Sequence, residues 1–489
     1  MKLLLLCADW GVPLDGDAGS SVHFRSMAKA LSAAGHEVRI IAAGEGDPAA
    51  FPWPVRFVPK NRWWPRIFGL LERVRGRGDA TAATPRDVAP APTERPDAAD
   101  PPGRAAFPSP LPPLQIAPPE PADSHELQRL SWRTRLLYRT LPRMVDRWEE
   151  LVGFRRRFGE VAAATLADWE PDAVYERYAL GQTGGALAAR RAGVPHLLEV
   201  NAPLTRERAE RGDLSGWLRR RCRRDEVALW TTADRVFCVS EPLRELVVGA
   251  GAAPERVLLT PNGVDTEIFA PERGRGRLRD AHGLGNAVLV GWLGSLSPGR
   301  GVQEFLAAMP EVLRRSPGAC GVVIGGGPLL AELRAVAARS GCGECMVFTG
   351  PVPHDDVPDC LADLDVAVAC YPERKDFYFS PMKVYEYLAS GLPTVAGDMG
   401  QMRELLDDGR AGVLLPPGDT DAWIEALTAL VADAPRRAEL SRRARARALS
   451  TGSWLRNAEI VAREAAGILA ETEMEPSASL SAETSGEDR

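Results

Sequence analysis

A lysine and a glutamate with the spacing of one helical face, Lys383 and Glu386, follow a short apolar strand in the second half of the chain. Ser380 favours the N-cap position, Pro381 suits the first helical position, and Gly391 is typical of the residue just past a helix end. These signals predict a helix of about three turns.

A lysine in the first turn of that helix opposes the helix dipole by about 0.3–1 kcal/mol. An anion bound at the exposed N–H groups reverses the penalty, because the lysine and the helix then both attract it. The spacing therefore suggests a phosphate site with a carboxylate, Glu386, one turn deeper. The alternative is a surface lysine beside a surface glutamate. The chain has only five lysines, which favours a specific role for Lys383.

Glycine-rich loops follow three other apolar strands in this half of the chain. Strand 287–293 leads into GSLSPGRG, strand 321–324 into GGGP and strand 346–349 into GPVPHDDVP. The helix that contains Lys383 follows strand 365–370. Because the carboxyl ends of parallel strands share one edge of a sheet, we expect these loops to surround one ligand site.

The first half of the chain shows the same alternation. Strand 3–7, the loop DWGVPLDGDAGSS, a helix from about Ser20 and strand 38–42 form an opening βαβ unit. The glycines do not match the dinucleotide fingerprint, so NAD binding is weakly supported. Four more strands alternate with helices between residues 173 and 260. The pattern predicts an α/β protein with two Rossmann-like, doubly wound domains that face each other across a cleft.

The expected segments are an N-terminal Rossmann-like domain over 1–265, a C-terminal Rossmann-like domain over 266–455, a C-terminal helix over 456–470 and a disordered acidic tail over 471–489. A proline-rich insertion at about 76–123 interrupts the first domain, and its composition predicts no regular structure. Residues 271–286 are rich in glycine, arginine and aspartate and are expected to form a linker.

Composition narrows the function classes. The formal net charge of −6 gives no electrostatic basis for nucleic acid as the main ligand. Eight cysteines scattered among apolar segments favour a reducing compartment. The apolar run at the N-terminus stops at Asp9, which favours a buried strand over a signal peptide. No apolar run reaches the roughly 18 residues of a membrane span, so we expect a cytoplasmic protein.

An arginine-rich amphipathic stretch covers residues 130–158, and a second basic cluster, WLRRRCRR, covers residues 217–224. One interpretation is peripheral contact with the inner face of an anionic membrane, or with an anionic acceptor. The other interpretation is a core-facing helix with a solvated basic back. The sequence gives no indication of the oligomeric state.

The ordered set of motifs resembles the glycosyltransferases of family 4, which have the GT-B fold. The set comprises PNGVDTEIF, GWLGSLSPGRG, VVIGGGPLLAEL, VFTGPVPHDDVPDCLADLDVAVACYP, SPMKVYEYLASGLPTVAGD and GVLLPPGD. In the first half, AGSSVHFRSMAKALSAAGHEV and LLEVNAPLTRER resemble the acceptor-side segments of the same family. The resemblance implies retaining, metal-independent transfer of a sugar from a nucleotide diphosphate sugar to a hydroxyl acceptor, such as a saccharide, glycolipid or natural product.

The resemblance also implies roles for individual residues. The implied catalytic residues are Arg300, Lys383, Glu386 and Asn201. The implied donor-binding residues are Gly294, Ser295, Gly325, Gly326, Val352, Tyr378, Ser380 and Met382. The implied acceptor-side residues are Gly19, Ser20, His23 and Glu199. No metal site and no cofactor are implied, because Arg300, Lys383 and a helix N-terminus can stabilise a departing diphosphate.

Three residues depart from the family pattern. Tyr378 stands where the family usually has a glutamate that orients the transferred sugar, and Asp376 or Glu373 are candidate substitutes. Ser295 replaces a cationic residue of the diphosphate loop. Asn201 occupies the place of a histidine and cannot act as a base. These departures leave open a GT-B enzyme of other chemistry, namely a pseudo-glycosyltransferase or a nucleotide-sugar epimerase, and a catalytically silent nucleotide-sugar-binding protein.

Three further signals have simpler alternatives. Cys342 and Cys345 have metal or redox spacing, but no second pair accompanies them, so a turn before a strand is expected. Asp363 and Asp365 resemble the metal-binding pair of the other glycosyltransferase fold, but here they precede a strand of the family pattern, and we expect Asp365 to cap or orient. A role near the acceptor and a plain surface position are both open for His23.

Overall fold

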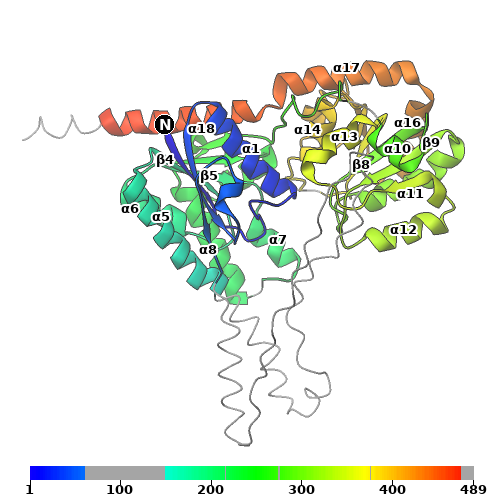
Figure 1. Ribbon diagram of the computed structural model, residues 1–489. Coiled ribbons are helices and arrows are strands. Elements are labelled where there is room, and N and C mark those ends of the chain that lie inside the picture. The colour runs from blue at the N-terminus through cyan, green and yellow to red at the C-terminus, as the bar shows by residue number, and fades with distance from the viewer. Residues whose placement is uncertain (61–148, 215, 274–275, 375, 475–489) are drawn as a thin grey trace, which may run out of the picture. The chain divides into compact units, whose positions relative to one another are not determined.

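The computed structural model describes residues 1–60, 149–214, 216–273, 276–374 and 376–474 (Figure 1). The chain divides into two units, Met1–Pro59 with Arg155–Arg489, and Lys60–Phe154. In the second unit, residues Glu149–Phe154 form a π-helical turn. The proline-rich insertion, the arginine-rich stretch before residue 149 and the tail after residue 474 lie outside the described residues.

A seven-stranded parallel sheet contains the N-terminal strands, in the order β3-β2-β1-β4-β5-β6-β7. Its strands are β1 (Lys2–Cys7), β2 (Glu37–Ala43), β3 (Val55–Val58), β4 (Ala173–Arg177), β5 (His196–Val200), β6 (Arg235–Cys238) and β7 (Val257–Leu259). Leu3, Leu4, Leu5 and Leu6 are all fully buried, as expected for a parallel strand covered on both faces. The strand order reverses between β1 and β4, so the loop after β1 lies at a topological switch point.

Helices cover this first sheet. They are α1 (Gly19–Ala33), α5 (Arg155–Trp169), α6 (Gly184–Ala192), α7 (Leu204–Glu210), α8 (Gly216–Thr232), α9 (Glu241–Gly249) and α18 (Trp454–Met474). The last described helix, α18, comes from the far end of the chain and packs along α1, near β1 (Figure 1). Trp454, Ala458, Val461 and Ala465 recur at helical spacing and join the core that contains Met27.

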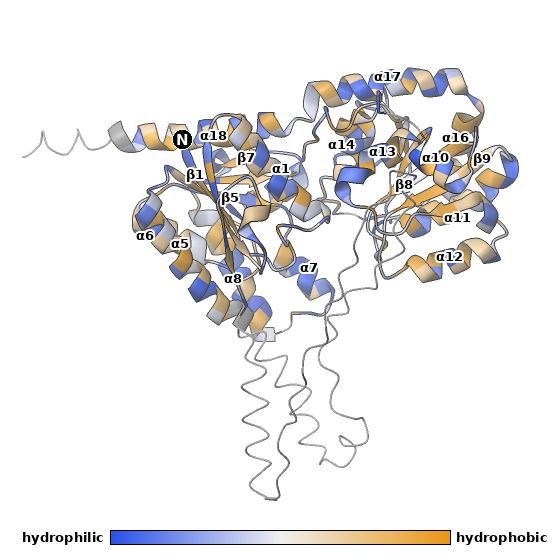
Figure 2. Cartoon of the chain, in the orientation of Figure 1, coloured by the Kyte–Doolittle hydropathy of each residue, from blue (hydrophilic) through white to orange (hydrophobic). Residues whose placement is uncertain are grey.

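A six-stranded parallel sheet contains the later strands, in the order β10-β9-β8-β11-β12-β13. Its strands are β8 (Val288–Leu293), β9 (Ala319–Ile324), β10 (Met346–Phe348), β11 (Val366–Ala369), β12 (Thr394–Gly397) and β13 (Val413–Leu415). Its helices are α10 (Arg277–His282), α11 (Val302–Arg315), α12 (Leu330–Arg339), α13 (Val357–Ala362), α14 (Met382–Ala389), α15 (Met402–Leu405), α16 (Thr420–Ala432) and α17 (Ala434–Thr451). Apolar and polar bands alternate along α11 and α17, as expected for helices with one buried side (Figure 2). The prediction of two doubly wound α/β folds, one around each parallel sheet, is confirmed.

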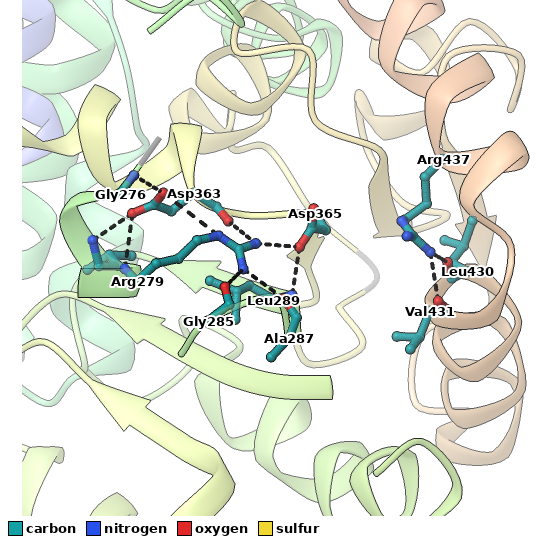
Figure 3. A network of polar contacts seen from close by, with 11 residues as sticks. Gly276, Arg279, Gly285, Ala287, Leu289, Asp363, Asp365, Leu430, Val431 and Arg437 are labelled. Atoms are coloured by element: carbon teal, nitrogen blue, oxygen red, sulfur yellow. Dashed lines mark hydrogen bonds and ion pairs between the residues drawn. The ribbon is translucent and has the colours of Figure 1, made fainter. Parts of the chain in front are cut away.

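The prediction of a linker at 271–286 is wrong, because helix α10 lies within this segment. Leu278 of this helix is fully buried, and its N–H donates to Asp363 Oδ2 at 2.6 Å. The Gly276 N–H donates to the other oxygen of Asp363 at 2.6 Å, and Arg279 donates to Asp365 Oδ2 at 2.8 Å (Figure 3). Asp363 thus caps α10, a role that was not expected of it, and Asp365 orients Arg279, in line with the orienting role expected of it.

Helix α14 is shorter than predicted and starts one residue later. It has eight residues, and its N-cap is Pro381, so Ser380 does not cap it. The Ser380 hydroxyl instead accepts a hydrogen bond from the Asn262 N–H at 3.0 Å. Gly391 follows the helix with a φ of 65°, as expected for the residue past a helix end. Among the described residues, no helix has both the length and the apolar character needed to cross a membrane.

Candidate functional site

The first turn of α14 lies beside the loop that follows β8. Tyr387 fixes this arrangement, because its buried hydroxyl accepts a hydrogen bond from the Leu293 N–H at 2.8 Å. Met382 and Lys383 form the first turn. A Cβ added to Gly294 would lie 3.2 Å from Lys383 Nζ, so the ammonium reaches back to the loop.

Aromatic rings surround the Lys383 ammonium. Its Nζ lies 3.9 Å from the ring centroid of Trp292 and 5.2 Å from that of Tyr371, which is cation–π geometry. Burial lowers the pKa of Lys383 to about 7, and the Arg300 charge acts in the same direction. Part of the residue's surface remains exposed. An anion placed beside this nitrogen would favour its charged form.

Arg300 is the other cation of this region. Its side chain is exposed, and its guanidinium lies 5.5 Å from the ring centroid of Phe379. Ser295, in the same loop, is also exposed, and its hydroxyl lies 3.0 Å from that of Ser297. Gly294 and Lys383 are therefore neighbours, and Arg300 is near enough for its charge to act on Lys383. Ser295 is exposed beside Gly294.

The loop after β9 packs directly on the loop after β8. A Cβ at Gly325 would lie 2.1 Å from the carbonyl oxygen of Gly294. A Cβ at Gly326 would lie 2.6 Å from Pro351, in the loop after β10. Loop packing alone therefore requires glycine at both positions. Val352, next to Pro351, is half-buried.

Glu386, one turn deeper in α14, is 6% exposed and is therefore not a surface carboxylate. Its Oε1 lies 3.2 Å from His354 Nε2. His354 belongs to the loop after β10, and its backbone N–H donates to Asp17 Oδ1 at 3.4 Å. His354 is not among the site residues predicted from the sequence, although it lies in a loop after a predicted strand.

A second charged centre, Glu199, lies at the end of β5 in the first sheet. Its side chain is buried and accepts hydrogen bonds from Arg177 at 2.8 Å and from His23 Nε2 at 2.9 Å. The Tyr175 hydroxyl and the Asn201 amide also donate to it. Burial opposes ionisation, but these donors, His23 first, hold the pKa of Glu199 well below its ordinary value.

His23 connects this carboxylate to the segment before α14. The histidine is 4% exposed, so the surface alternative is wrong. Its Nδ1 lies 2.6 Å from Asn262 Oδ1, and Asn262 Nδ2 donates to the Ser380 carbonyl at 2.6 Å. A path of hydrogen bonds thus runs from Glu199 to the residue before the N-cap of α14. The sequence analysis treated Asn262, in PNGVD, only as a turn residue.

The starts of α1 and α14 also meet. A Cβ at Gly19 would lie 3.4 Å from Met382 Sδ. Ser20, the second residue of α1, is half-buried. A residue expected on the acceptor side and a residue expected on the donor side are therefore neighbours.

Tyr378 packs against the first sheet's core. Its hydroxyl donates to Glu207 Oε1 at 2.5 Å, and its carbonyl accepts from the Ser240 hydroxyl at 2.6 Å. Burial, followed by the Glu207 charge, raises the pKa of the Tyr378 hydroxyl. Asp376, a candidate substitute for the missing glutamate, pairs with Arg206 at 2.7 Å. Both residues are thus engaged with α7, and a contact of either with a donor sugar stays a prediction.

The cysteine pair has different environments. Cys342 is buried and precedes a short 3-10 turn, Gly343–Cys345, whose last residue is the exposed Cys345; both cysteines are free thiols. Within the described ranges, no group of three or more histidine, cysteine, aspartate or glutamate side chains has an arrangement that could hold a metal ion.

Two relatives match part of this chain in sequence. A GDP-mannose-dependent alpha-(1-6)-phosphatidylinositol monomannoside mannosyltransferase from Mycolicibacterium smegmatis is 34% identical over 226 residues, which cover 45% of this chain and 59% of that protein. A D-inositol 3-phosphate glycosyltransferase from Acidothermus cellulolyticus is 30% identical over 291 residues, which cover 57% of this chain and 63% of that protein. Less than two thirds of either relative is therefore matched.

Solved structures and family profiles agree with these relatives. The structure of Anabaena HepE in complex with UDP and glucose aligns with a TM-score of 0.62 at 16% identity, over 96% of this chain and 100% of that chain. This likeness supports the GT-B fold. The profile of the glycosyl transferase 4-like domain matches residues 18–263, just over half of the chain, and the profile of glycosyl transferases group 1 matches residues 287–433. The chain therefore belongs to the glycosyltransferases of family 4.

Proposed function

We propose that this chain transfers a sugar from a nucleotide diphosphate sugar to a hydroxyl acceptor, with retention of anomeric configuration and without a metal ion. The main support is the Lys383 ammonium, which lies between two aromatic rings beside Gly294 and the first turn of α14. Relatives named as a GDP-mannose-dependent mannosyltransferase and a glycosyltransferase, and a neighbour solved with UDP and glucose, support the donor class.

In the proposed reaction, the diphosphate leaves beside two cations and a helix N-terminus. Lys383, Arg300 and the amides of Met382 and Lys383 stabilise the charge that develops on the leaving oxygen. Glu386, oriented by His354, accepts hydrogen bonds from ribose hydroxyls. Cations and dipoles placed in advance need no reorganisation during the step, so they stabilise the transition state more than water does.

The remaining predicted residues form the walls of the proposed site. Gly294, Ser295, Gly325, Gly326, Val352, Tyr378 and Ser380 border the donor, and Gly19, Ser20, His23, Glu199 and Asn201 border the acceptor. Asn201 orients the acceptor by hydrogen bonding, because an amide has no basic nitrogen.

The test is turnover of a panel of nucleotide sugars, with candidate hydroxyl acceptors, in the presence of EDTA. We expect one donor to be consumed, with thermal stabilisation by the matching nucleotide diphosphate and a product of retained configuration. Lys383→Met should lower the rate of transfer by about 10²–10³-fold and Glu386→Ala should abolish transfer, with both proteins folded, while Lys29→Met on α1 serves as the control. Conversion of the donor to its epimer, a non-glycosidic product, or binding without turnover would contradict the proposal.

We also propose a cytoplasmic site of action with contact at the inner membrane face through residues 130–158. The support is the arginine periodicity of that stretch and the lipid acceptor in one relative's name. Sedimentation of the full chain with vesicles of anionic lipid, compared with vesicles of zwitterionic lipid, tests this. Equal recovery with both would contradict it.

A further inference from the structure

His23 makes two hydrogen bonds to acceptor atoms. Its Nε2 lies 2.9 Å from the Glu199 carboxylate, and its Nδ1 lies 2.6 Å from Asn262 Oδ1. Asn262 cannot be turned around, because its Nδ2 donates to the Ser380 carbonyl at 2.6 Å. A flipped amide would place its oxygen against that carbonyl. The oxygen of Asn262 therefore faces His23 as an acceptor.

Glu199 also faces His23 as an acceptor. The carboxylate receives hydrogen bonds from Tyr175, Arg177 and Asn201 in addition to His23. Neutral imidazole has one N–H and can donate to only one of these two partners. Both partners are therefore satisfied together only when each ring nitrogen of His23 donates a hydrogen bond. The edge of its ring also packs on Trp454 at a centroid distance of 4.8 Å.

The hydrogen bonds of His23 lead to both proposed sides of the site, directly to Glu199 and through Asn262 to Ser380. Glu199 and Asn201 lie at the end of β5, on the proposed acceptor side. Ser380 precedes α14, which carries the first-turn amides and Lys383 of the proposed donor side. The Asn262 N–H donates to the Ser380 hydroxyl at 3.0 Å, which adds a second bond to this junction.

We propose that His23 is a positioning residue that couples the two halves of the site. As an imidazolium it holds Glu199 with one N–H and Asn262 with the other, so that the start of α14 has a fixed place relative to Asn201. This inference rests on the proposed function for its kinetic consequence only. The coupling itself is a property of the unliganded chain.

The first measurement is hydrogen–deuterium exchange at the backbone amides of Ser380 and of residues 382–385 in the full-length protein, since Pro381 has no amide hydrogen. His23→Gln cannot donate in two opposite directions, and Asn262→Asp keeps the acceptor for His23 but loses the donor to Ser380. A hydrogen bond to a charged group contributes about 1.5–3 kcal/mol, so exchange in His23→Gln should rise by roughly 10-fold or more. The bond lost in Asn262→Asp joins two neutral groups, so exchange in that variant should rise by about fivefold.

Lys29→Met is the matched control. Lys29 also links α1 to the segment that contains Asn262, through an ion pair of 2.9 Å with Asp265, but it lies on the surface. We expect exchange at the amides of Ser380 and of residues 382–385 to stay within about twofold of the wild type in this variant. Unchanged exchange in Asn262→Asp, or an equal rise in Lys29→Met, would overturn the coupling, even where His23→Gln fails to fold.

The second measurement separates positioning from a structural role. We expect kcat for transfer to fall by about 10–100-fold in His23→Gln and Asn262→Asp, while KM for the donor stays within about threefold. A lower melting temperature with an unchanged kcat would overturn the positioning role. Absence of transfer in the wild type would refute the proposed function, and the exchange experiment would still decide the coupling.

Discussion

The two charged centres of the candidate site, Lys383 and Glu199, are buried in opposite ways. The lysine lies between Trp292 and Tyr371, and burial lowers its pKa to about 7. Within the described part of the chain, no carboxylate lies within ion-pair distance of its Nζ. Glu199 accepts hydrogen bonds from four side chains and stays ionised despite its burial. The protein itself supplies the hydrogen-bond donors of the carboxylate, so we call Glu199 the complete centre. Lys383 has no carboxylate partner among the described residues, so we call it the incomplete centre.

The largest effect should come from removing the complete centre. Glu199→Gln keeps the shape but leaves Arg177 and His23 without their negative partner, which should lower the free energy of unfolding by about 3–5 kcal/mol. Urea unfolding measures this change. Glu311→Gln, which breaks an exposed pair with Arg314, should lower the free energy of unfolding much less. Equal losses in the two variants would show that burial does not distinguish them.

Removing the incomplete centre should have the opposite effect on stability. Lys383→Met should lower the rate of transfer by about 10²–10³-fold, because the departing diphosphate loses a cation. Its melting temperature at pH 7 should rise, because the unfolded state no longer gains by protonating a lysine whose pKa the fold lowers. Lys29→Met should change neither quantity. A less stable Lys383→Met protein would contradict the contrast between the two centres.

The pH dependence of donor binding follows from the same lysine. Between its folded pKa of about 7 and its ordinary value of 10.5, the unliganded protein holds Lys383 neutral, and a bound diphosphate favours the charged form. Affinity for the nucleotide diphosphate should therefore fall as the pH rises above about 7, by at most about tenfold per unit. Calorimetric titrations from pH 6 to pH 9 measure this slope, and its persistence in Lys383→Met would contradict the assignment.

The smallest predicted effect concerns the aromatic contacts of Lys383. Tyr371→Leu removes one ring, and a cation–π contact contributes about 0.5–1 kcal/mol, so KM for the donor should change by about 2–5-fold. Tyr371→Phe keeps the ring and should resemble the wild type. A change in Tyr371→Phe as large as that in Tyr371→Leu would assign the effect to the hydroxyl instead.

Local signals in the sequence predicted much of the fold. The bounds of β1, β8 and β11 match the prediction to within one residue at each end, since each strand has a strong apolar pattern between turn residues. Helix α10 was missed because its composition resembles a linker and its cap, Asp363, lies 85 residues from Leu278. A capping partner so distant leaves no local signal.

In the candidate site, too, residues with local sequence signals could be predicted, and residues held by distant contacts could not. Lys383 and Glu386 were selected from local spacing, and the structure places them in one helix beside the expected loops. Asn262 could not be selected in this way, because its partners His23 and Ser380 lie 239 and 118 residues away. Tyr378 was selected by its place in a motif, but its hydroxyl contacts Glu207 at a separation of 171 residues. Contacts between distant segments are decided by topology, which a motif does not encode.

The return of α18 to α1 determines an order of events during synthesis. Trp454, Val461 and Ile468 cover the apolar side of a helix built from the first 33 residues. The last strand of the first sheet ends at Leu259, so at ribosomal speeds of about 5–20 residues per second, on the order of ten seconds or more pass before α18 emerges. Every strand of the second sheet is made during that interval. The domain that begins first is therefore completed last.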